Sequence, residues 1–423
     1  MRYVIVMFLL FLSLHIFAQE LIGFSFRMDK DYRDAPVSIP LDLIKYNDSL
    51  QLELYEITKS DHKLVPSQTE TGYSARLWFI LDGLSPKNST RKFILKLSDK
   101  KGAESRDNQI QINKSDGNLT LYTQKSSILS YRFETMYPPK GVDPLFKRSG
   151  FIHPLWSPKG EVLSRVQPPD HYHHYGIWGP WTLTHIENRE VDFWNLNKGQ
   201  GTVRFAGFLS EITGQVFSGF KALQQHMDFG AKGEDQIAMN ELLDVRVWNS
   251  KKGVWVIDYT TSINTPLKNG IMLDAYRYGG GIGYRATERW TKENCTVLTS
   301  EGKTRVDADG SNARWCIVEG ESGVNGERSG ILFLSHPSNR AHPEPMRVWP
   351  IDGNGGRGDM YFEFTPIRHK SWALKNGNDY VLKYRMIVFD GKMDKEIAES
   401  YWNSFSGTPE IDYKKSDVSK QNK

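Results

Sequence analysis

The chain of 423 residues carries 54 Lys and Arg residues against 50 Asp and Glu residues, a net charge of +4. The two signs are interspersed without a basic stripe, so nucleic acid is not an expected partner. The two cysteines, Cys295 and Cys316, allow at most one disulfide and exclude a disulfide-rich scaffold. The length exceeds one typical domain and predicts two or three.

The first 18 residues have the three parts of a secretory leader. Met1 and Arg2 give a charged start, residues 3–17 are apolar, and Ala18 is a small residue at the cleavage point. The apolar run is shorter than the roughly 20 residues of a membrane-spanning helix, and no lipid-accepting cysteine follows it. We therefore expect cleavage after Ala18 and a periplasmic or secreted protein without a membrane anchor.

Short segments of alternating apolar and polar residues follow the leader. Residues 49–57, 75–80 and 92–97 alternate in this way between turns rich in Pro, Gly, Asn and Asp, which is typical of β-strands. We predict a small N-terminal β-sandwich over residues 19–115. The polar stretch 99–118 is expected to be an interdomain connection or the tip of a long hairpin.

Further strand patterns occupy residues 119–133, 236–248, 253–263, 331–335 and 380–389. Helical spacing of apolar residues occurs in residues 394–405. The predicted fold is mostly β: the small sandwich, then a large antiparallel β-sandwich domain over 116–410 with few helices, then a disordered tail over 411–423. The glycine run 279–283 is predicted to be a bend at a ligand or a neighbouring strand, because no strand-turn-helix context follows it.

The densest group of polar side chains lies between His153 and His185. These 33 residues hold five of the ten histidines that follow the leader, and three of them fall in the run Asp170-His171-Tyr172-His173-His174-Tyr175. Packing alone does not explain such clustering, since buried imidazoles cost stability. We therefore expect the functional site here.

Two chemistries fit the cluster. In an extended segment His171 and His173 would share one face and His174 would lie on the other. The pair, with Asp170 or a distant histidine, could hold a divalent metal such as zinc. The imidazoles could instead transfer protons directly. A metal needs a third and a fourth ligand that the sequence does not place, so we favour direct acid–base catalysis, with no cofactor or a divalent metal ion.

Two later patches also gather groups suited to a site. Arg277 and Tyr278 lie beside the flexible glycines, and arginine is the usual partner of a planar carboxylate or sulfate. The segment 335–343 follows an apolar strand, so its polar groups would emerge at a strand end, where loops carry sites. Its candidates are His336, Asn339, Arg340 and His342.

The three patches, in this order, resemble a family of secreted bacterial proteins that carries the automatic label of a methane oxygenase of the PmoA type. The matching pieces are HPLWSPKGEVLSRVQPPDHYHHYGIWG from His153, REVDFWN from Arg189, LFLSHPSNRAHP from Leu332 and VLKYRMIVFDG from Val381. The element DH-x-HH-x-G-x-W is the most specific of them. The family usually has arginine where this chain has Tyr175. We reject methane oxidation, because a particulate methane oxygenase subunit spans the membrane several times and this chain has one removable apolar segment.

The resemblance implies a component of a polysaccharide-utilisation locus and extends to an oligosaccharide dehydratase of ulvan-degrading systems. It implies an oligosaccharide substrate, other polysaccharide-degrading enzymes as functional partners, and a carbon–oxygen lyase reaction. In that reaction β-elimination forms an unsaturated uronic acid.

Roles for this elimination can be assigned to residues of the three patches. His173 or Tyr175 would remove the proton from the carbon that bears the carboxylate, and His174 or His336 would protonate the departing oxygen. A carboxylate clamp by Arg277 or Arg340 would stabilise the developing enolate, and a metal could replace it. The other expected substrate-binding residues are His153, Asp170, His171, Trp178, Tyr278, Asn339 and His342.

Two alternatives compete with elimination. A glycoside hydrolase usually needs two positioned carboxylates, and the nearest candidates are Asp170, Glu187, Glu190 and Asp192. A non-catalytic glycan-binding protein would instead use an aromatic stacking surface, for which the candidates are Trp156, Trp178, Trp181 and Trp194.

Overall fold

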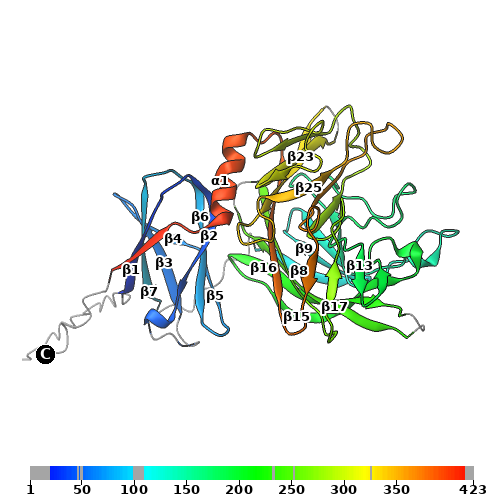
Figure 1. Cartoon of the computed structure of the whole chain (residues 1–423). Helices are drawn as coiled ribbons and strands as arrows, with labels where there is room; N and C mark the ends of the chain where they lie inside the picture. The colour runs from blue at the N-terminus through cyan, green and yellow to red at the C-terminus, as the bar shows by residue number, and fades with distance from the viewer. Residues whose placement is uncertain are drawn as a thin grey trace, which may run out of the picture.

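The computed structural model describes residues 20–44, 47, 51–98, 109–230, 234–250, 253–323 and 326–414. The predicted leader lies outside this part of the chain. Within it the chain forms five antiparallel sheets and a single α-helix (Figure 1), which confirms the mostly β fold class. No helix of the described residues is both long and apolar enough to cross a membrane.

The small domain is built from two sheets that share a core. The five-stranded sheet has the order β29 (Glu410–Lys414), β1 (Glu20–Arg27), β7 (Thr90–Leu97), β3 (Leu52–Ile57), β4 (His62–Val65). The three-stranded sheet has the order β2 (Tyr32–Pro40), β6 (Arg76–Ser85), β5 (Ser67–Glu70), and a 3-10 turn spans Asp42–Ile44. Side chains of β6 alternate between buried and half-buried or exposed, the period of two expected for a strand with one face in the core.

Two predicted boundaries of this domain are wrong. Strand β29 pairs with β1, Phe24 opposite Tyr413, so residues 411–414 are part of a sheet and not of a tail. The remaining tail, 415–423, lies outside the described residues. Strand β8 (Gln111–Ser115) belongs to the large domain, so the predicted boundary at 115 falls one strand too late. Both strands are short and polar, and only their pairing partners define them.

The large domain consists mainly of two long sheets on either side of one hydrophobic core. The eight-stranded sheet has the order β15 (Gly201–Ile212), β16 (Phe217–Asp228), β17 (Gln236–Trp248), β18 (Val254–Asn264), β28 (Tyr380–Asp390), β24 (Arg328–Ser335), β23 (Trp315–Glu321), β21 (Thr296–Thr299). The nine-stranded sheet has the order β22 (Asn312–Ala313), β25 (Glu344–Val348), β26 (Tyr361–Phe364), β20 (Ile282–Arg285), β12 (Ile177–Trp178), β11 (Phe151–Leu155), β10 (Ser127–Arg132), β9 (Asn118–Tyr122), β8.

A third, four-stranded sheet lies at one end of the large domain. Its order is β14 (Arg189–Val191), β13 (Thr184–Ile186), β19 (Ile271–Leu273), β27 (Trp372–Leu374). Two 3-10 turns, Pro144–Phe146 and Leu196–Lys198, lie in the loops between strands. The strands predicted in this domain are found, except that residues 119–133 form the hairpin β9–β10, because a turn closes between Thr123 and Ser126.

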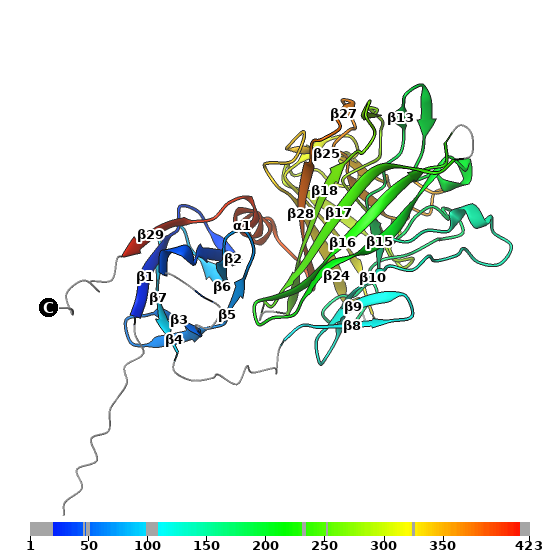
Figure 2. The same cartoon turned by 90° about the horizontal axis from the view of Figure 1, so that it is seen from below.

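Helix α1 (Lys395–Ser406) lies between the two domains (Figures 1 and 2). It begins where Asp394 accepts a hydrogen bond from the Ile397 amide at 2.7 Å, as an N-cap does. Its Tyr401 hydroxyl donates to Asp34 of the small domain, and its Glu399 accepts from Trp315 Nε1 of the large domain. The helix predicted over 394–405 is therefore confirmed, and it joins the two domains.

Two further expectations concern cysteine and glycine. Cys295 and Cys316 are buried free thiols, so the disulfide that the sequence permits is absent. The glycine run is the predicted bend: Gly280 has φ +87°, and a Cβ on it would lie 2.2 Å from the Trp181 ring. The backbone there passes too close to a neighbour for any side chain.

Candidate functional site

The histidine cluster lies on a loop of two consecutive turns. His171 N donates to the Pro168 carbonyl at 2.9 Å, and His174 N donates to the His171 carbonyl at 3.0 Å. A bridge between Val166 and Tyr175 closes the loop. The expected extended conformation, with His174 opposite the other two histidines, is therefore wrong.

The turns bring His171, His173 and His174 together. The imidazole centroids are 5.3 Å apart for His171 and His173, and 4.8 Å for each of the other two pairs. One nitrogen from each ring lies within 4.8 Å of the other two. His171 and His173 are half-buried, whereas His174 is 1% exposed. The adjacent His174 thus offers the third imidazole nitrogen that the sequence did not place.

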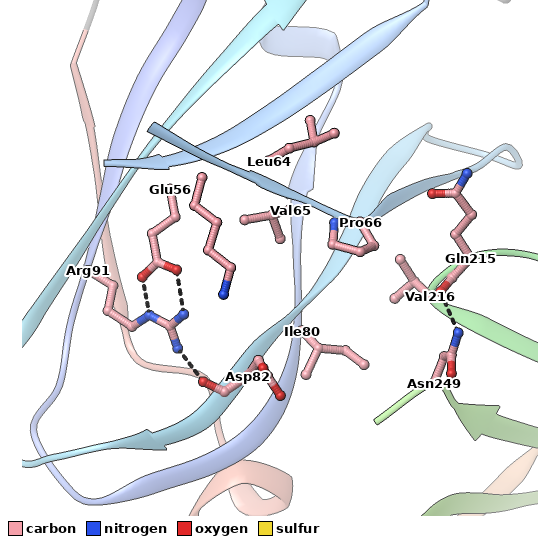
Figure 3. Close-up of a pocket in the computed structure, with 11 residues that line it drawn as sticks. Glu56, Leu64, Val65, Pro66, Ile80, Asp82, Arg91, Gln215, Val216 and Asn249 are labelled. Carbon is pink, nitrogen blue, oxygen red and sulfur yellow. Dashed lines mark hydrogen bonds and ion pairs between the residues drawn. The ribbon is translucent and has the colours of Figure 1, made fainter. Parts of the chain in front are cut away.

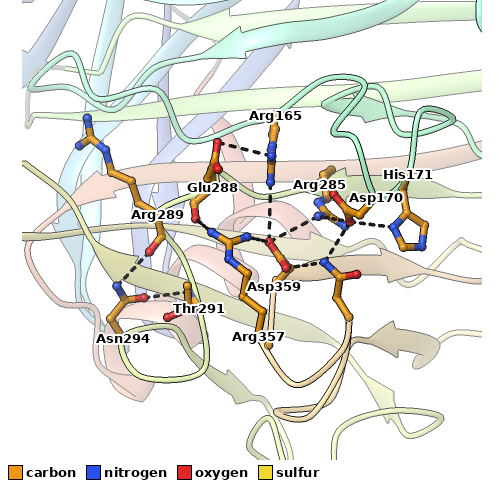
Figure 4. Close-up of polar contacts among 12 residues, drawn as sticks. Arg165, Asp170, His171, Arg285, Glu288, Arg289, Thr291, Asn294, Arg357 and Asp359 are labelled. Atoms are coloured by element: carbon orange, nitrogen blue, oxygen red, sulfur yellow. Dashed lines mark hydrogen bonds and ion pairs between the residues drawn. The ribbon is translucent and has the colours of Figure 1, made fainter. Parts of the chain in front are cut away.

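Asp170 orients the first imidazole. Its Oδ2 accepts hydrogen bonds from His171 Nδ1 at 2.7 Å, from Arg285 Nη2 at 2.8 Å and from Asn354 Nδ2 at 3.1 Å (Figure 4). Burial opposes ionisation of this carboxyl, but the hydrogen bonds and the Arg285 charge outweigh it and lower the pKa of Asp170. The carboxylate therefore stays ionised and holds a proton on Nδ1 of His171, which leaves Nε2 as the free nitrogen.

A network of further charged side chains holds the Asp170 carboxylate in position. Arg285 is buried, its guanidinium lies 4.7 Å from the Trp349 ring centre, and it is 3.5 Å from Asp359. Asp359 also contacts Arg357 and accepts from Asn354 at 2.6 Å. These pairs fix Asp170 in place, because moving it would leave a buried arginine charge without its partner.

The histidines line a cavity of about 270 Å3. Aromatic rings form much of its wall: Trp194 meets Tyr278 edge to face at 4.6 Å, and Trp349 and Tyr361 lie on the side of His174. The Trp194 indole also donates to the His173 carbonyl at 2.9 Å. The remaining lining residues are Arg277, Arg347, Pro350, Gly353 and Asn354. None of the described residues that line it is Asp or Glu.

Burial controls the protonation of this site. It lowers the pKa of His173 to about 4 and that of His174 well below its usual value, with repulsion from neighbouring cationic groups acting in the same direction. These imidazoles are therefore neutral near pH 7. Burial and the neighbouring Tyr276 raise the pKa of the Tyr278 phenol to about 12, so it stays protonated.

Three residues predicted for the site lie behind the cavity. Tyr175 is buried, its hydroxyl donates to the Phe146 carbonyl, and Arg148 lies over its ring at 5.4 Å. Trp178 is buried beneath His174. His153 contacts Ser164 Oγ at 2.9 Å. None of the three lines the cavity: Tyr175 and Trp178 point into the core where the loop turns into β12, and His153 lies on β11.

The third predicted patch forms a separate cluster beside α1. His342 stacks on Trp402 and His336 lies against Phe405. Asn339 donates to Glu344 at 3.1 Å, and Arg340 donates to the carbonyls of Lys370 and Ser371. None of these four candidates lines the histidine cavity, so the structure separates this patch from the first two.

Six cavity residues were missed from the sequence: Arg347, Trp349, Pro350, Gly353, Asn354 and Tyr361. They come from one segment, in which a Trp-Pro pair precedes a run with glycines at 353, 355, 356 and 358. Such a run after a strand could have marked a site loop. Only the fold brings it beside the histidines, across β26 and β20.

A smaller cavity of about 100 Å3 lies where the two domains meet (Figure 3). Its walls include Leu64 and Ile80 of the small domain and Val216 of the large one. Two charged groups there pair with each other, Arg91 with Glu56 at 2.6 Å. This cavity belongs to the domain junction.

The fold and the site together define a two-domain β-sandwich protein with a histidine-lined, aromatic cavity. The chain belongs to a protein family of unknown function, DUF6807, whose model matches residues 118–403. The match runs from β9 into α1 and contains every residue that lines the histidine cavity. A search of curated proteins finds no match.

Proposed function

We propose that this protein is a carbohydrate-active enzyme, a carbon–oxygen lyase that dehydrates uronic-acid-containing oligosaccharides by β-elimination. One observation carries the proposal: a single cavity gathers aromatic walls, two arginines and three imidazoles. Each group matches one requirement of the reaction.

The aromatic walls suit a sugar ring. Trp194, Tyr278 and Trp349 offer apolar ring surface, on which the C–H face of a pyranose packs. A neighbouring cavity of about 420 Å3 shares Tyr278 and is lined by Asn195 and Asn197, whose amides can bind hydroxyl groups. The two cavities offer room for adjoining units of an oligosaccharide.

Arg277 and Arg347 suit a carboxylate. Arg277 is exposed at the rim, and Arg347 is half-buried with one nitrogen on Asp309 at 2.6 Å. A guanidinium binds a carboxylate through two parallel hydrogen bonds and stabilises the enolate charge that forms when the adjacent carbon loses its proton.

The proton transfers use the remaining groups. The histidine cluster supplies the acceptor for the proton on the carbon that bears the carboxylate. The electron pair of that C–H bond forms the C=C bond, and the C–O bond at the next carbon breaks. The protonated phenol of Tyr278 donates to the departing oxygen, which leaves as water. Tyr278 takes the donor role expected of His174 or His336, and the histidine cluster takes the acceptor role expected of His173 or Tyr175. Tyr175 and His336 do not line the cavity.

Hydrolysis has less support. Asp170 is held by His171 and Arg285, Asp192 is buried and accepts two backbone amides, Glu190 pairs with Lys198, and Glu187 is exposed. These carboxylates do not form a free pair across one cavity, as a glycosidase needs. The aromatic walls also suit a non-catalytic glycan-binding protein, which differs by lacking turnover.

The leader predicted from the sequence gives this function a location. An oligosaccharide dehydratase in the periplasm or outside the cell would act on fragments released by other polysaccharide-degrading enzymes, such as those that cut ulvan.

The test is incubation of the protein with uronate-containing oligosaccharides. Elimination should give a mass loss of one water and a new ultraviolet absorbance from the C=C bond conjugated to the carboxylate. Hydrolysis would give new reducing ends without that absorbance. Binding without any product would assign the cavity to a glycan-binding protein.

A further inference from the structure

We propose that His171, His173 and His174 form a mononuclear site for a divalent transition-metal ion, with one side of the ion open to the cavity. The geometry of the histidine loop carries this inference, and it stands whether or not the proposed reaction is correct.

The three nitrogens are close to a ligating arrangement. Each lies within 4.8 Å of the other two. Around a tetrahedral zinc ion with bonds of about 2.1 Å, nitrogens lie about 3.4 Å apart. Rotations of the imidazoles about their side-chain bonds cover the difference. The loop backbone need not move, because its turns are held by hydrogen bonds from His171 N, His174 N and the Trp194 indole.

The surroundings of His171 are those of a metal ligand. Asp170 binds Nδ1 at 2.7 Å, so Nε2 is the nitrogen available for an ion. A carboxylate on the far nitrogen of a ligating histidine fixes the ring and raises its basicity. Asp170 itself accepts hydrogen bonds from Arg285 and Asn354, so the carboxylate that orients His171 is fixed in turn. A histidine on the surface without a ligand does not need this second layer of contacts.

His174 adds an independent observation. It lines the cavity and is 1% exposed, and its Nδ1 has no hydrogen-bond partner among the described residues. A buried polar nitrogen without a partner costs about 1–3 kcal/mol. An ion or its bound water at the cluster would give the buried ring a polar contact.

The ligand set also selects the ion. Three imidazoles favour zinc, copper, nickel or cobalt over magnesium and calcium, which prefer oxygen ligands. None of the described residues that line the cavity adds a carboxylate, so three protein ligands leave at least one position open. That position faces the cavity, where a water or a substrate oxygen can bind. The three histidines would hold the ion, and the ion would supply Lewis-acid polarisation of an oxygen bound at this position.

The experiment measures metal binding on the full chain after exhaustive dialysis against a chelator. Zinc should bind at one equivalent per chain in calorimetry and raise the melting temperature. Cobalt should bind with the visible absorption bands of a low-coordinate nitrogen site, and X-ray absorption should count three imidazoles. Absence of stoichiometric binding, or an imidazole count of zero or one, would overturn the proposal.

Variants locate the site. His173→Ala removes one of the two half-buried histidines and should abolish stoichiometric binding with an unchanged circular dichroism spectrum. Asp170→Asn keeps all three ligands and should weaken affinity about 10–100-fold, which provides a test even where the alanine variant is unstable. His185→Ala is the matched control, because His185 pairs with Asp274 and does not line the cavity. This variant should bind zinc with the affinity of the parent protein. Equal binding by parent, His173→Ala and Asp170→Asn would place the metal elsewhere.

The outcomes for the metal-site proposal and for the lyase proposal can be distinguished. Stoichiometric zinc without a dehydrated product would leave the metal site standing and remove the lyase. A dehydrated product from protein that binds no metal would do the reverse.

Discussion

At the scale of single residues, environment separates side chains that look equivalent in the sequence. Tyr175 and Tyr278 both lie in polar, aromatic segments, but only Tyr278 reaches the cavity. Tyr175 directs its hydroxyl to the Phe146 carbonyl beneath the loop. The same holds for the histidines, since His173 lines the cavity and His336 lies against Phe405. Whether a tyrosine or a histidine can take part in the reaction therefore depends on where its side chain points, and not on its residue type alone.

The two tyrosines give a matched pair of substitutions. Tyr278→Phe removes the proton donor of the cavity and should lower turnover about 10²–10⁴-fold. Tyr175→Phe removes one of the two donors to the Phe146 carbonyl, since Gln167 Nε2 still donates to it, and should cost about 1 kcal/mol of stability while turnover is retained. Steady-state kinetics and denaturant unfolding of both variants measure this. The opposite pattern would return the catalytic role to Tyr175.

The carboxylate clamp is tested by charge-conserving substitution. Arg277→Lys keeps the positive charge and loses the two-pronged hydrogen bonding, so KM for uronate substrates should rise roughly tenfold. Arg289→Lys is the control, because Arg289 is exposed and pairs with Glu161 away from the cavity. An unchanged KM in Arg277→Lys would remove Arg277 from the clamp.

At the scale of elements, the histidine loop depends on the glycine that follows it. Gly176 has φ +68°, and a Cβ there would lie 2.3 Å from the Ile152 carbonyl of β11. Its backbone amide donates a hydrogen bond to the Arg165 carbonyl at 2.9 Å, and its carbonyl accepts one from the Arg285 backbone amide at 2.8 Å. Gly176 thus joins the loop to the strands on both sides and aligns Asp170 with Arg285.

Gly176→Ala should displace the loop. Gly160→Ala is a matched control, because Gly160 has φ +93° but open space at the Cβ position. The control should cost about 1 kcal/mol from backbone strain alone, whereas Gly176→Ala should cost several times more and abolish zinc binding. Calorimetric titration and denaturant unfolding distinguish them. An equal loss of stability in the two variants would contradict the importance of the close contact between Gly176 and the Ile152 carbonyl.

At the scale of the whole molecule, a buried carboxyl links the two long sheets. Glu344 of β25 accepts hydrogen bonds from Tyr384 of β28 at 2.7 Å and from Ser335 of β24 at 2.6 Å. Complete burial raises the pKa of Glu344 to about 7, although these hydrogen bonds act in the opposite direction. The folded protein therefore binds this proton more tightly than the unfolded chain does.

This gives a pH dependence of stability with a defined sign. The contribution is fully present below the unfolded pKa of 4.5 and is lost as pH rises through about 7. Glu344→Gln removes the ionisation, so from pH 5 to pH 8 its stability relative to the parent should rise by up to about 3 kcal/mol. Urea unfolding of both proteins across this range measures the difference. A difference that is constant with pH would show that Glu344 is ionised in the folded protein throughout.

Sequence periodicity determined the mostly β fold, most strand positions and helix α1. These are local properties, since a strand that buries one face repeats every two residues and a helix every 3.6. The clustering of His171, His173 and His174 also marked the loop that carries the candidate site. The sequence did not give the direction of His174, because an extended segment and a pair of turns place it on opposite sides.

Only the tertiary structure decided which patches share a cavity. It brought Arg277, Tyr278 and the segment from Arg347 to Tyr361 to the histidines, and it moved His336 and Arg340 to a separate cluster. The pairing of β20 with β12 and β26 brings these segments of the chain together. It also assigned β29 to the small domain by pairing it with β1. Such pairings join residues far apart in the chain, and no local pattern encodes which strand will be the partner.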